Sequence, residues 1–143
     1  MKIGHRSSRT MSKIAFIVIV IGLLAAIAAV IFSNLYKNTF FAEKKFDEIT
    51  RHYYEDNVYE TVILENKGED VEKIFKKYPS GFFVKLRQAL NWEFLENNTN
   101  YRSFFETESF SCDTNESYAK FIPRAPYGKK DYDVEFNLKC TKN

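Results

Sequence analysis

The sequence has few of the residues on which common catalytic motifs depend. It contains two histidines, two cysteines, five glycines and three prolines among 143 residues. It has no glycine-rich phosphate loop, no HExxH zinc motif and no GxSxG nucleophile motif, so no hydrolase or nucleotide-binding class is indicated. No Gly/Ser-rich linker divides the chain, which excludes an evident boundary between two globular domains.

The most informative feature present is an apolar run, Ile14–Phe32, with no charge over 19 consecutive residues. As an α-helix it would be about 28 Å long, close to the hydrocarbon thickness of a bilayer. We therefore predict a transmembrane helix over residues 14–34, with the lipid bilayer as its partner. Two alternatives stay open: a signal peptide cleaved at Ala26-Ile27-Ala28, and a buried helix of a soluble protein.

Charge is distributed unequally around this run. The residues before it include no acid and four bases, Lys2, Arg6, Arg9 and Lys13. All 19 acidic residues and the other 17 basic residues follow it, so the downstream part has a net charge of −2. Because basic flanks stay in the cytoplasm, residues 1–13 are expected inside and residues 35–143 outside. The basic excess is then a topology signal, and no nucleic-acid partner is predicted.

Both cysteines, Cys112 and Cys140, fall in the part expected outside. Thiols oxidise in extracytoplasmic compartments, so the pair predicts a disulfide. The chain-entropy estimate assigns a cross-link over this separation about 3.5 kcal/mol of stability. A metal-binding pair is the alternative, but neither a CxxC spacing nor a nearby histidine supports it. We predict no metal and no cofactor.

Residues 35–143 suffice for one small domain, and its first part has a helical pattern. One helical face after the membrane run is apolar, at Ala42, Phe46, Ile49 and Tyr53. The first helix is therefore expected to continue as a helical stalk. The tract Val58–Leu64 either extends this helix or forms a short strand, and periodicity does not decide between them.

Two further helices are expected, with Asp70 and Ser80 as their N-caps. The apolar face of the first consists of Val71, Ile74, Phe75 and Tyr78. The apolar face of the second consists of Phe83, Leu86, Leu90 and Phe94. The polar tetrapeptide Asn97-Asn98-Thr99-Asn100 ends the second helix.

The last part of the chain has strand character. Tyr118–Pro123 and Tyr132–Cys140 predict two antiparallel strands, and the second alternates apolar with polar residues. Pro126-Tyr127-Gly128 between them is a turn signal. The predicted fold is thus α+β: an N-terminal transmembrane helix with a stalk, two further helices and a C-terminal β-hairpin with one disulfide.

The end of this hairpin is a candidate binding surface. Its members are Arg124, Tyr127, Lys129 and Lys130. Positive charge beside an aromatic ring suits an anionic envelope polymer or a protein, and a merely solvated hairpin end is the alternative. The 14 phenylalanines, nine tyrosines and one tryptophan fit either an exposed binding face or a packed core.

One histidine on the stalk is the only candidate for chemistry. His52 has Glu48, Glu55 and Asp56 within helical reach, a spacing that suits a metal or acid–base site. Such pairs also occur by chance in charged helices, and no third ligand is specified. We therefore predict no catalytic residue and no enzyme, with a small hydrolase or metal-dependent enzyme as an alternative.

The tract Ile17–Ala28 (IVIVIGLLAAIA) resembles the N-terminal helix of type IV pilins. Such proteins also have a basic leader, a long helix and a C-terminal disulfide. The sequence departs from the family where its assembly glutamate belongs, because Lys13 stands there, and Ser8-Arg9 occupies the processing site. The resemblance implies a minor pilin-like subunit as another alternative.

Four further tracts resemble an uncharacterised family of short single-pass or secreted proteins of the Saccharibacteria. They are Arg51–Tyr59, Val84–Leu90, Ser111–Asn115 and Pro126–Tyr132. This resemblance implies a bacterial cell envelope and supplies no catalytic residue. The sequence therefore predicts a single-pass, non-enzymatic protein of the cell membrane whose outside domain binds an envelope protein or a surface polymer.

Overall fold

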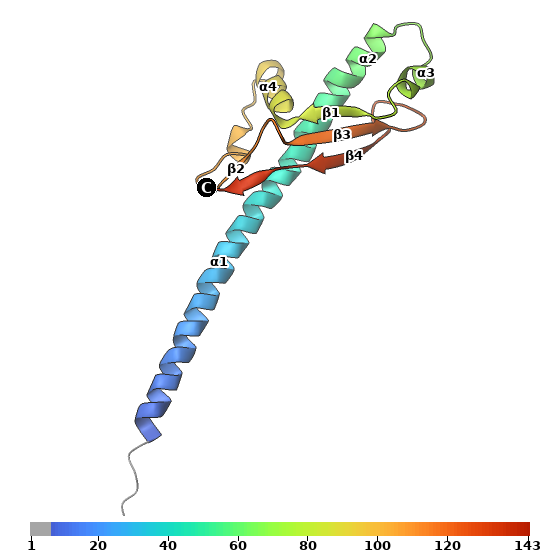
Figure 1. Cartoon of the computed structure of the whole chain (residues 1–143). Coiled ribbons are helices and arrows are strands. Elements are labelled where there is room, and N and C mark those ends of the chain that lie inside the picture. Colours follow the sequence, from blue (N-terminus) through green and yellow to red (C-terminus); the bar gives the residue numbers. More distant parts are fainter. Residues whose placement is uncertain (1–6) are drawn as a thin grey trace, which may run out of the picture. The chain divides into compact units, whose positions relative to one another are not determined.

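The structure is a computed structural model that describes the backbone of residues 7–143 and the side chains of residues 15–33 and 39–143 (Figure 1). The chain divides into two units, Met1–Asn38 and Thr39–Asn143. The predicted basic segment 1–13 has its side chains outside the described residues.

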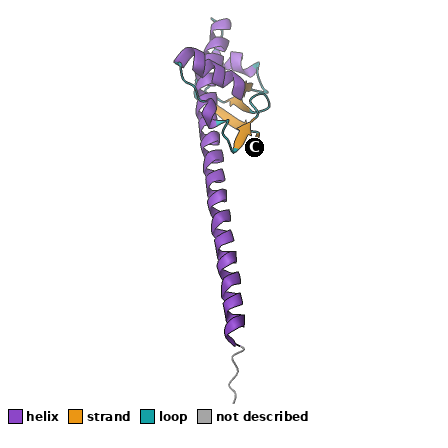
Figure 2. Ribbon diagram, turned by 90° about the vertical axis from the view of Figure 1, so that its left-hand side faces the viewer, coloured by secondary structure: helices purple, strands orange, loops and turns teal. Residues whose placement is uncertain are grey.

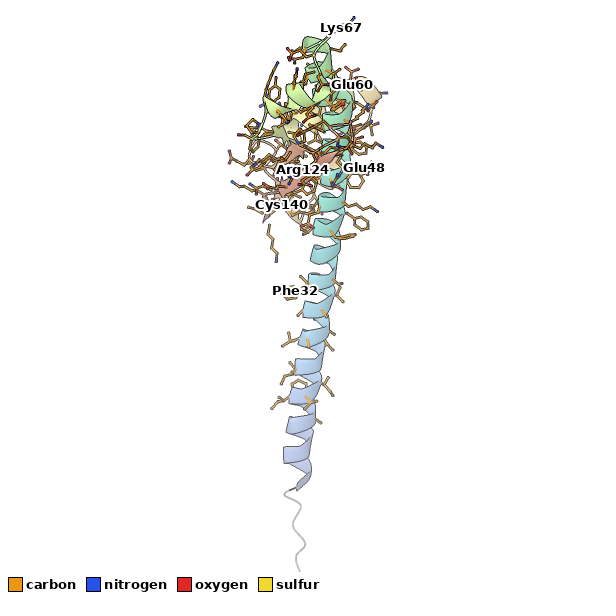
Figure 3. The ribbon with its side chains drawn as sticks, turned by 90° about the vertical axis from the view of Figure 1, so that its right-hand side faces the viewer. Phe32, Glu48, Glu60, Lys67, Arg124 and Cys140 are labelled. Atoms are coloured by element: carbon orange, nitrogen blue, oxygen red, sulfur yellow. A yellow bond between two sulfur atoms is a disulfide. The ribbon has the colours of Figure 1, made fainter. Side chains whose placement is uncertain are left out.

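The first unit is helical. Helix α1 spans Ser7–Tyr53, and its segment Ala15–Ser33 has a mean hydropathy of 3.2 with none of its side chains buried. Figure 3 shows these apolar side chains around the helix as far as the labelled Phe32. The prediction of a helix long and apolar enough to cross a membrane is confirmed, by length and composition.

In the second unit, α1 is followed by a π-helical turn, η1 (Tyr54–Tyr59), and by α2 (Glu60–Glu65). This answers the open question about Val58–Leu64, which is helical. The buried stripe advances in steps of four residues, because its members are Ala42, Phe46, Thr50 and Tyr54. Tyr53, predicted on that stripe, is only partly buried and lies edge-on to Trp92.

Helix α3 (Val71–Lys76) begins as predicted. The carboxylate of Asp70 accepts hydrogen bonds from the backbone N–H groups of Glu72 and Lys73, at 3.0 and 3.4 Å. Its apolar residues Ile74 and Phe75 are buried against Val62 of α2. An oxygen at the N-cap satisfies donors that the first helical turn leaves without partners.

The prediction that Ser80 caps the next helix is wrong. Phe82–Lys85 forms strand β1, and helix α4 spans Leu86–Asn97. The strand pairs with β3, and pairing overrides the local helical spacing of Phe83 with Leu86. Gly81 makes this possible: its φ is +75°, and a Cβ there would lie 2.4 Å from a backbone oxygen of Phe121.

Helix α4 ends where the sequence predicts. Asn97 is its last residue, and Asn98 adopts the left-handed conformation with φ of 51°. At the other end, the backbone N–H of Lys85 donates to Oε1 of Gln88 at 2.9 Å, which fixes the start of the helix at Leu86. A short 3₁₀ turn, η2 (Arg102–Phe104), follows.

The predicted hairpin is present, in strands β3 (Tyr118–Pro123) and β4 (Tyr132–Asn137). With β1 they form an antiparallel sheet in the order β1-β3-β4 (Figure 2). The second strand was expected to reach Cys140, but it ends at Asn137. Lys139 turns away, because its N–H donates to Oγ of Ser117 and its carbonyl accepts from the N–H of Asp113.

Cys140 instead begins β5 (Cys140–Lys142), which pairs with β2 (Phe110–Cys112) in a separate two-stranded sheet. The disulfide joins Cys112 to Cys140, which face each other across this pair of strands. The predicted α+β class and cystine are therefore confirmed, and the sequence did not reveal the second sheet.

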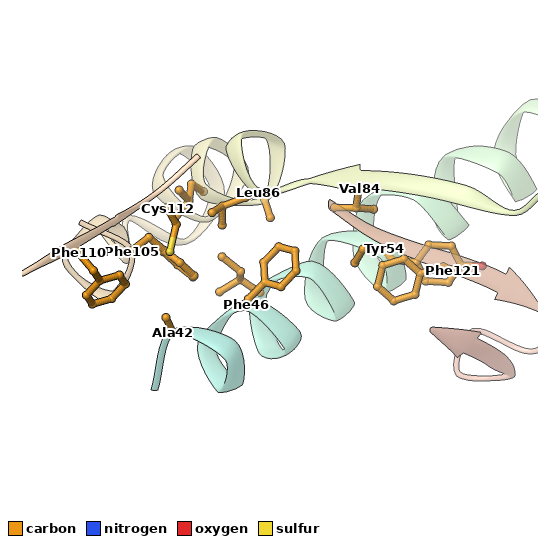
Figure 4. Packing of buried hydrophobic residues seen from close by; sticks show 13 residues of the cluster. Ala42, Phe46, Tyr54, Val84, Leu86, Phe105, Phe110, Cys112 and Phe121 are labelled. Atoms are coloured by element: carbon orange, nitrogen blue, oxygen red, sulfur yellow. The ribbon is translucent and has the colours of Figure 1, made fainter. Parts of the chain in front are cut away.

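Most aromatic side chains serve the core. Tyr54 of η1 stacks on Phe121 of β3, with ring centroids 4.4 Å apart and planes 4° from parallel (Figure 4). Phe46 lies between the helix and the start of α4, near Leu86. Six phenylalanines of the second unit are nevertheless exposed, at positions 40, 41, 83, 94, 104 and 136.

Candidate functional site

The hairpin residues predicted to bind a partner are mostly engaged within the domain. The guanidinium of Arg124 pairs with the carboxylate of Asp133. The ammonium of Lys129 lies 2.6 Å from Asp56 and 3.1 Å from Glu60. Hydrogen bonds to these two carboxylates raise the pKa of Lys129, and the hydrogen bond from Lys129 lowers the pKa of Asp56.

Tyr127 also serves the fold. It has φ of 66°, and its carbonyl accepts a hydrogen bond of 3.0 Å from the hydroxyl of Tyr59. Its ring lies parallel to that of Phe75, with centroids 6.3 Å apart. Lys130 differs, since it is exposed and makes no ion pair with any other described residue. The binding role of these four residues stays a prediction, with Lys130 as the one charge that the fold leaves open.

His52 ties the stalk to helix α4. Its Nδ1 lies 2.6 Å from Oε1 of Glu93, and its Nε2 lies 3.0 Å from Oδ2 of Asp56. Glu93 is 3% exposed, and it also accepts a hydrogen bond of 3.1 Å from Asn97. Of the three carboxylates expected near His52, only Asp56 pairs with it, whereas Glu93 comes from a distant segment.

This cluster has no geometry suited to a metal ion. Within residues 15–33 and 39–143, no group of three or more His, Cys, Asp or Glu side chains is arranged to hold one. Asp56 is shared with Lys129, and the ring of His52 packs edge-on to Trp92 with centroids 5.0 Å apart. The arrangement therefore suits a structural tie between helices.

A better candidate site lies beside α4, where the domain has a cavity of about 310 Å³. Its floor is apolar and is formed by the buried residues Leu90, Phe105 and Cys112. Polar and charged side chains form the remainder of its lining: Arg87, Asn91, Arg102, Glu106, Thr114 and Asn115.

Three elements bring this lining together. Arg87, Leu90 and Asn91 share one face of α4, at positions i, i+3 and i+4. The backbone N–H of Arg87 donates to the carbonyl of Thr114 at 3.0 Å, and its Nη1 lies 3.4 Å from Oδ1 of Asn115. The start of α4 is thus fastened to the turn that follows β2.

Asp113 shapes that turn. Its Oδ1 accepts hydrogen bonds from the backbone N–H groups of Asn115 and Glu116, at 2.8 and 2.9 Å. These bonds, first the one from Glu116, lower the pKa of Asp113. The adjacent cystine holds Cys112 at the cavity floor, so the wall formed by Thr114 and Asn115 is held on both sides.

A second cavity of about 480 Å³ adjoins the first, and both are lined by Leu90, Asn91 and Arg102. Its further lining residues are Phe94, Leu95 and Asn100. Phe94 is 56% and Leu95 76% exposed. The prediction that Phe94 lies on an apolar inner face is therefore wrong. We call the residues that line the two cavities the α4 face.

The charges of the α4 face are not balanced. Arg87 and Arg102 form no ion pair with any carboxylate among the described residues, although Glu106 lines the same cavity. The opposite holds for Arg51, which is 2.5 Å from Asp47, and for the paired Arg124 and Lys129. Two arginines against one glutamate leave an excess of one positive charge in the first cavity.

Sequence reasoning missed this face. The spacing of Arg87, Leu90, Asn91 and Phe94 indicates that one side of a helix carries both polar and apolar residues. Arg102, Glu106 and Asn115 join it only through the η2 turn and the turn after β2, which no local pattern places beside α4.

A comparison of the chain with known protein families, with curated proteins and with solved structures finds no match.

Proposed function

We propose that this chain is a single-pass membrane protein whose N-terminus is cytoplasmic and whose outside domain binds another protein of a bacterial cell envelope without catalysis. The apolar helix Ala15–Ser33 supports the anchor by its length and composition. The cystine supports an oxidising compartment for the domain that contains it.

The observation that carries the binding function is the α4 face. It combines two adjoining cavities, two arginines without acidic partners and exposed Phe94 and Leu95. Concave surfaces with apolar lining and a few polar groups are the usual form of binding sites. Exposed aromatic and arginine side chains are also enriched where proteins bind each other.

Topology is tested first, with the full chain produced in bacteria. We expect it in the membrane pellet, with residues 39–143 degraded when protease is added to intact spheroplasts. Maleimide labelling of the denatured protein should require prior reduction, because both cysteines are in the disulfide. A soluble protein, or a domain protected from protease until lysis, would contradict the anchor or its orientation.

Binding in cells is tested with a photo-crosslinking amino acid placed at Leu95 or, as the control, at exposed Lys130. We expect a discrete crosslinked species from position 95 and a weaker one or none from position 130. Equal patterns from both positions would contradict recognition by the α4 face.

A pilin-like subunit is a second candidate, favoured by the long helix α1 that leads into a domain with an antiparallel sheet and a C-terminal cystine. It requires removal of a leader before the apolar run. Intact mass of the mature protein decides, because a full-length N-terminus would exclude it.

A further inference from the structure

We propose that the α4 face recognises an acidic segment of a partner protein, with one carboxylate in the cavity lined by Arg87 and Arg102 and a neighbouring apolar side chain against Phe94 and Leu95. This assignment rests on the proposed binding function and names the chemistry of its partner.

Charge is the first argument. Arginine binds carboxylates through two parallel N–H donors, and such bonds are among the strongest polar contacts in proteins. Arg51, Arg124 and Lys129 meet this demand inside the domain, whereas Arg87 and Arg102 do not. An external carboxylate is the complementary partner for the two guanidinium groups.

Glu106 limits how much negative charge the cavity accepts. It lines the same cavity as Arg87 and Arg102, so the local excess is one positive charge. A single carboxylate balances that excess, whereas a dense polyanion would place further negative charges near Glu106. Like charges at short range disfavour binding.

The second cavity supplies the argument for a protein segment. It shares Leu90, Asn91 and Arg102 with the first cavity and adds the exposed apolar groups of Phe94 and Leu95. A polypeptide presents a carboxylate and an apolar side chain side by side, and asparagine amides can bond its peptide groups. A phosphate-rich surface polymer offers nothing for the apolar part.

The probe is a display library of random short peptides, selected on the full chain in lipid nanodiscs after depletion on empty nanodiscs. We expect selected peptides to carry Asp or Glu near Phe, Leu or Ile. Selection of no peptide, or of peptides without an acidic residue, would overturn the proposal.

The best peptide is then measured by fluorescence anisotropy on variants of the full chain. Arg87→Gln combined with Arg102→Gln should weaken binding about tenfold or more, as expected for lost hydrogen bonds to a charged group. The matched control, Arg124→Gln with Lys130→Gln, removes the same charge from the hairpin end and should change affinity less than about twofold. Equal losses from both pairs would overturn the site.

Two further measurements separate this assignment from general charge attraction. Glu106→Gln should tighten binding of the acidic peptide, and replacing the peptide's acid by its amide should abolish that gain. Inorganic polyphosphate should compete poorly; if it bound more tightly than the peptide and depended on the same arginines, the partner would be a polymer instead. If spheroplast protection places the domain inside the cell while the peptide results hold, the proposed location fails and the recognition chemistry stands.

Discussion

Two sides of the second unit differ in how completely they satisfy their own side chains. On the side of the β1-β3-β4 sheet, Tyr54, Phe121 and Tyr132 pack ring against ring, and charged groups at the hairpin end pair with each other. On the side of the β2-β5 sheet, the α4 face leaves two arginines and two large apolar residues open. The comparison indicates that one side maintains the fold and the other is available for recognition.

The disulfide explains how the open side stays ordered. Strands β2 and β5 have three residues each, too few to form a stable pair on their own. Their link through Cys112 and Cys140 limits the freedom of the unfolded chain and holds the cavity floor in place. Covalent linkage thus takes the part that aromatic packing has on the other side.

The largest effect is expected for Phe121→Ala on the packed side. The ring is fully buried against Tyr54 and Tyr132, so its loss should lower the free energy of unfolding by about 3–5 kcal/mol. Urea denaturation followed by tyrosine fluorescence measures this. The control is Phe83→Ala on neighbouring β1, whose ring is exposed; equal costs for the two variants would break the comparison.

Removing the disulfide by Cys112→Ser with Cys140→Ser should cost about 2–4 kcal/mol. We expect the loss to be concentrated on the open side, with faster hydrogen exchange in β2, β5 and the turn after β2. Strands β3 and β4 should keep most of their protection. Uniform acceleration across both sheets would show that the two sides do not differ in what stabilises them.

Alkaline pH should weaken the packed side. Burial, followed by the hydrogen bond to Glu55, raises the pKa of Tyr132 to about 12, and burial also raises that of Tyr54. A pKa raised in the folded state adds stability that is complete below the ordinary tyrosine value of about 10 and is lost as pH rises through the folded value. Stability should therefore fall between about pH 10 and 12.

Ultraviolet titration at the phenolate band tests this prediction. Two tyrosines should ionise late, and Tyr132→Phe should remove one of them and flatten the alkaline decline. A Tyr101→Phe variant serves as the control, because Tyr101 lies outside the stacked group. Unchanged late ionisation in Tyr132→Phe would contradict the assignment.

A smaller effect is expected from Lys129→Gln at the hairpin end. The hydrogen bond from Lys129 is the main cause of the low pKa of Asp56, so this pKa should rise toward its ordinary value. A lowered carboxyl pKa gives stability above the ordinary value of about 3.9 that is lost as pH falls through the folded value. The variant should lose part of this acid dependence.

Carboxyl carbon NMR of Asp56 against pH measures that change directly. Lys130→Gln is the matched control, since Lys130 makes no ion pair in the described part of the chain. An equal rise of the Asp56 pKa in both variants would indicate a general field instead of the specific pair.

The smallest effect on stability is expected at the open side. Arg87→Gln with Arg102→Gln should change the free energy of unfolding by less than about 0.5 kcal/mol, because neither guanidinium has an acidic partner to lose. The same pair is expected to cause the largest loss of peptide binding. Strong destabilisation by this variant would mean that the arginines belong to the fold.

Local pattern predicted several elements well. Asp70 caps α3, Asn97 ends α4, and Tyr118–Pro123 pairs with the strand that begins at Tyr132. In each case a few neighbouring residues supply the deciding interaction. The errors occurred where a distant segment decides, as when pairing with β3 makes Phe82–Lys85 a strand.

The candidate site was not predictable for the same reason. The sequence directed attention to Arg124, Tyr127 and Lys129, whose partners Asp133, Tyr59 and Asp56 become visible only in the folded domain. Charge in a sequence shows which groups exist, whereas their availability depends on whether folding pairs them.

By itself the sequence determined the apolar helix, the chemistry of the one cystine and the hairpin, because composition and short-range periodicity suffice for each. The tertiary structure decided that Cys140 lies in a second sheet and that Leu95 and two arginines stay open beside α4. Those outcomes depend on contacts between segments far apart in the chain, which compete with local preference and prevail through burial and strand pairing.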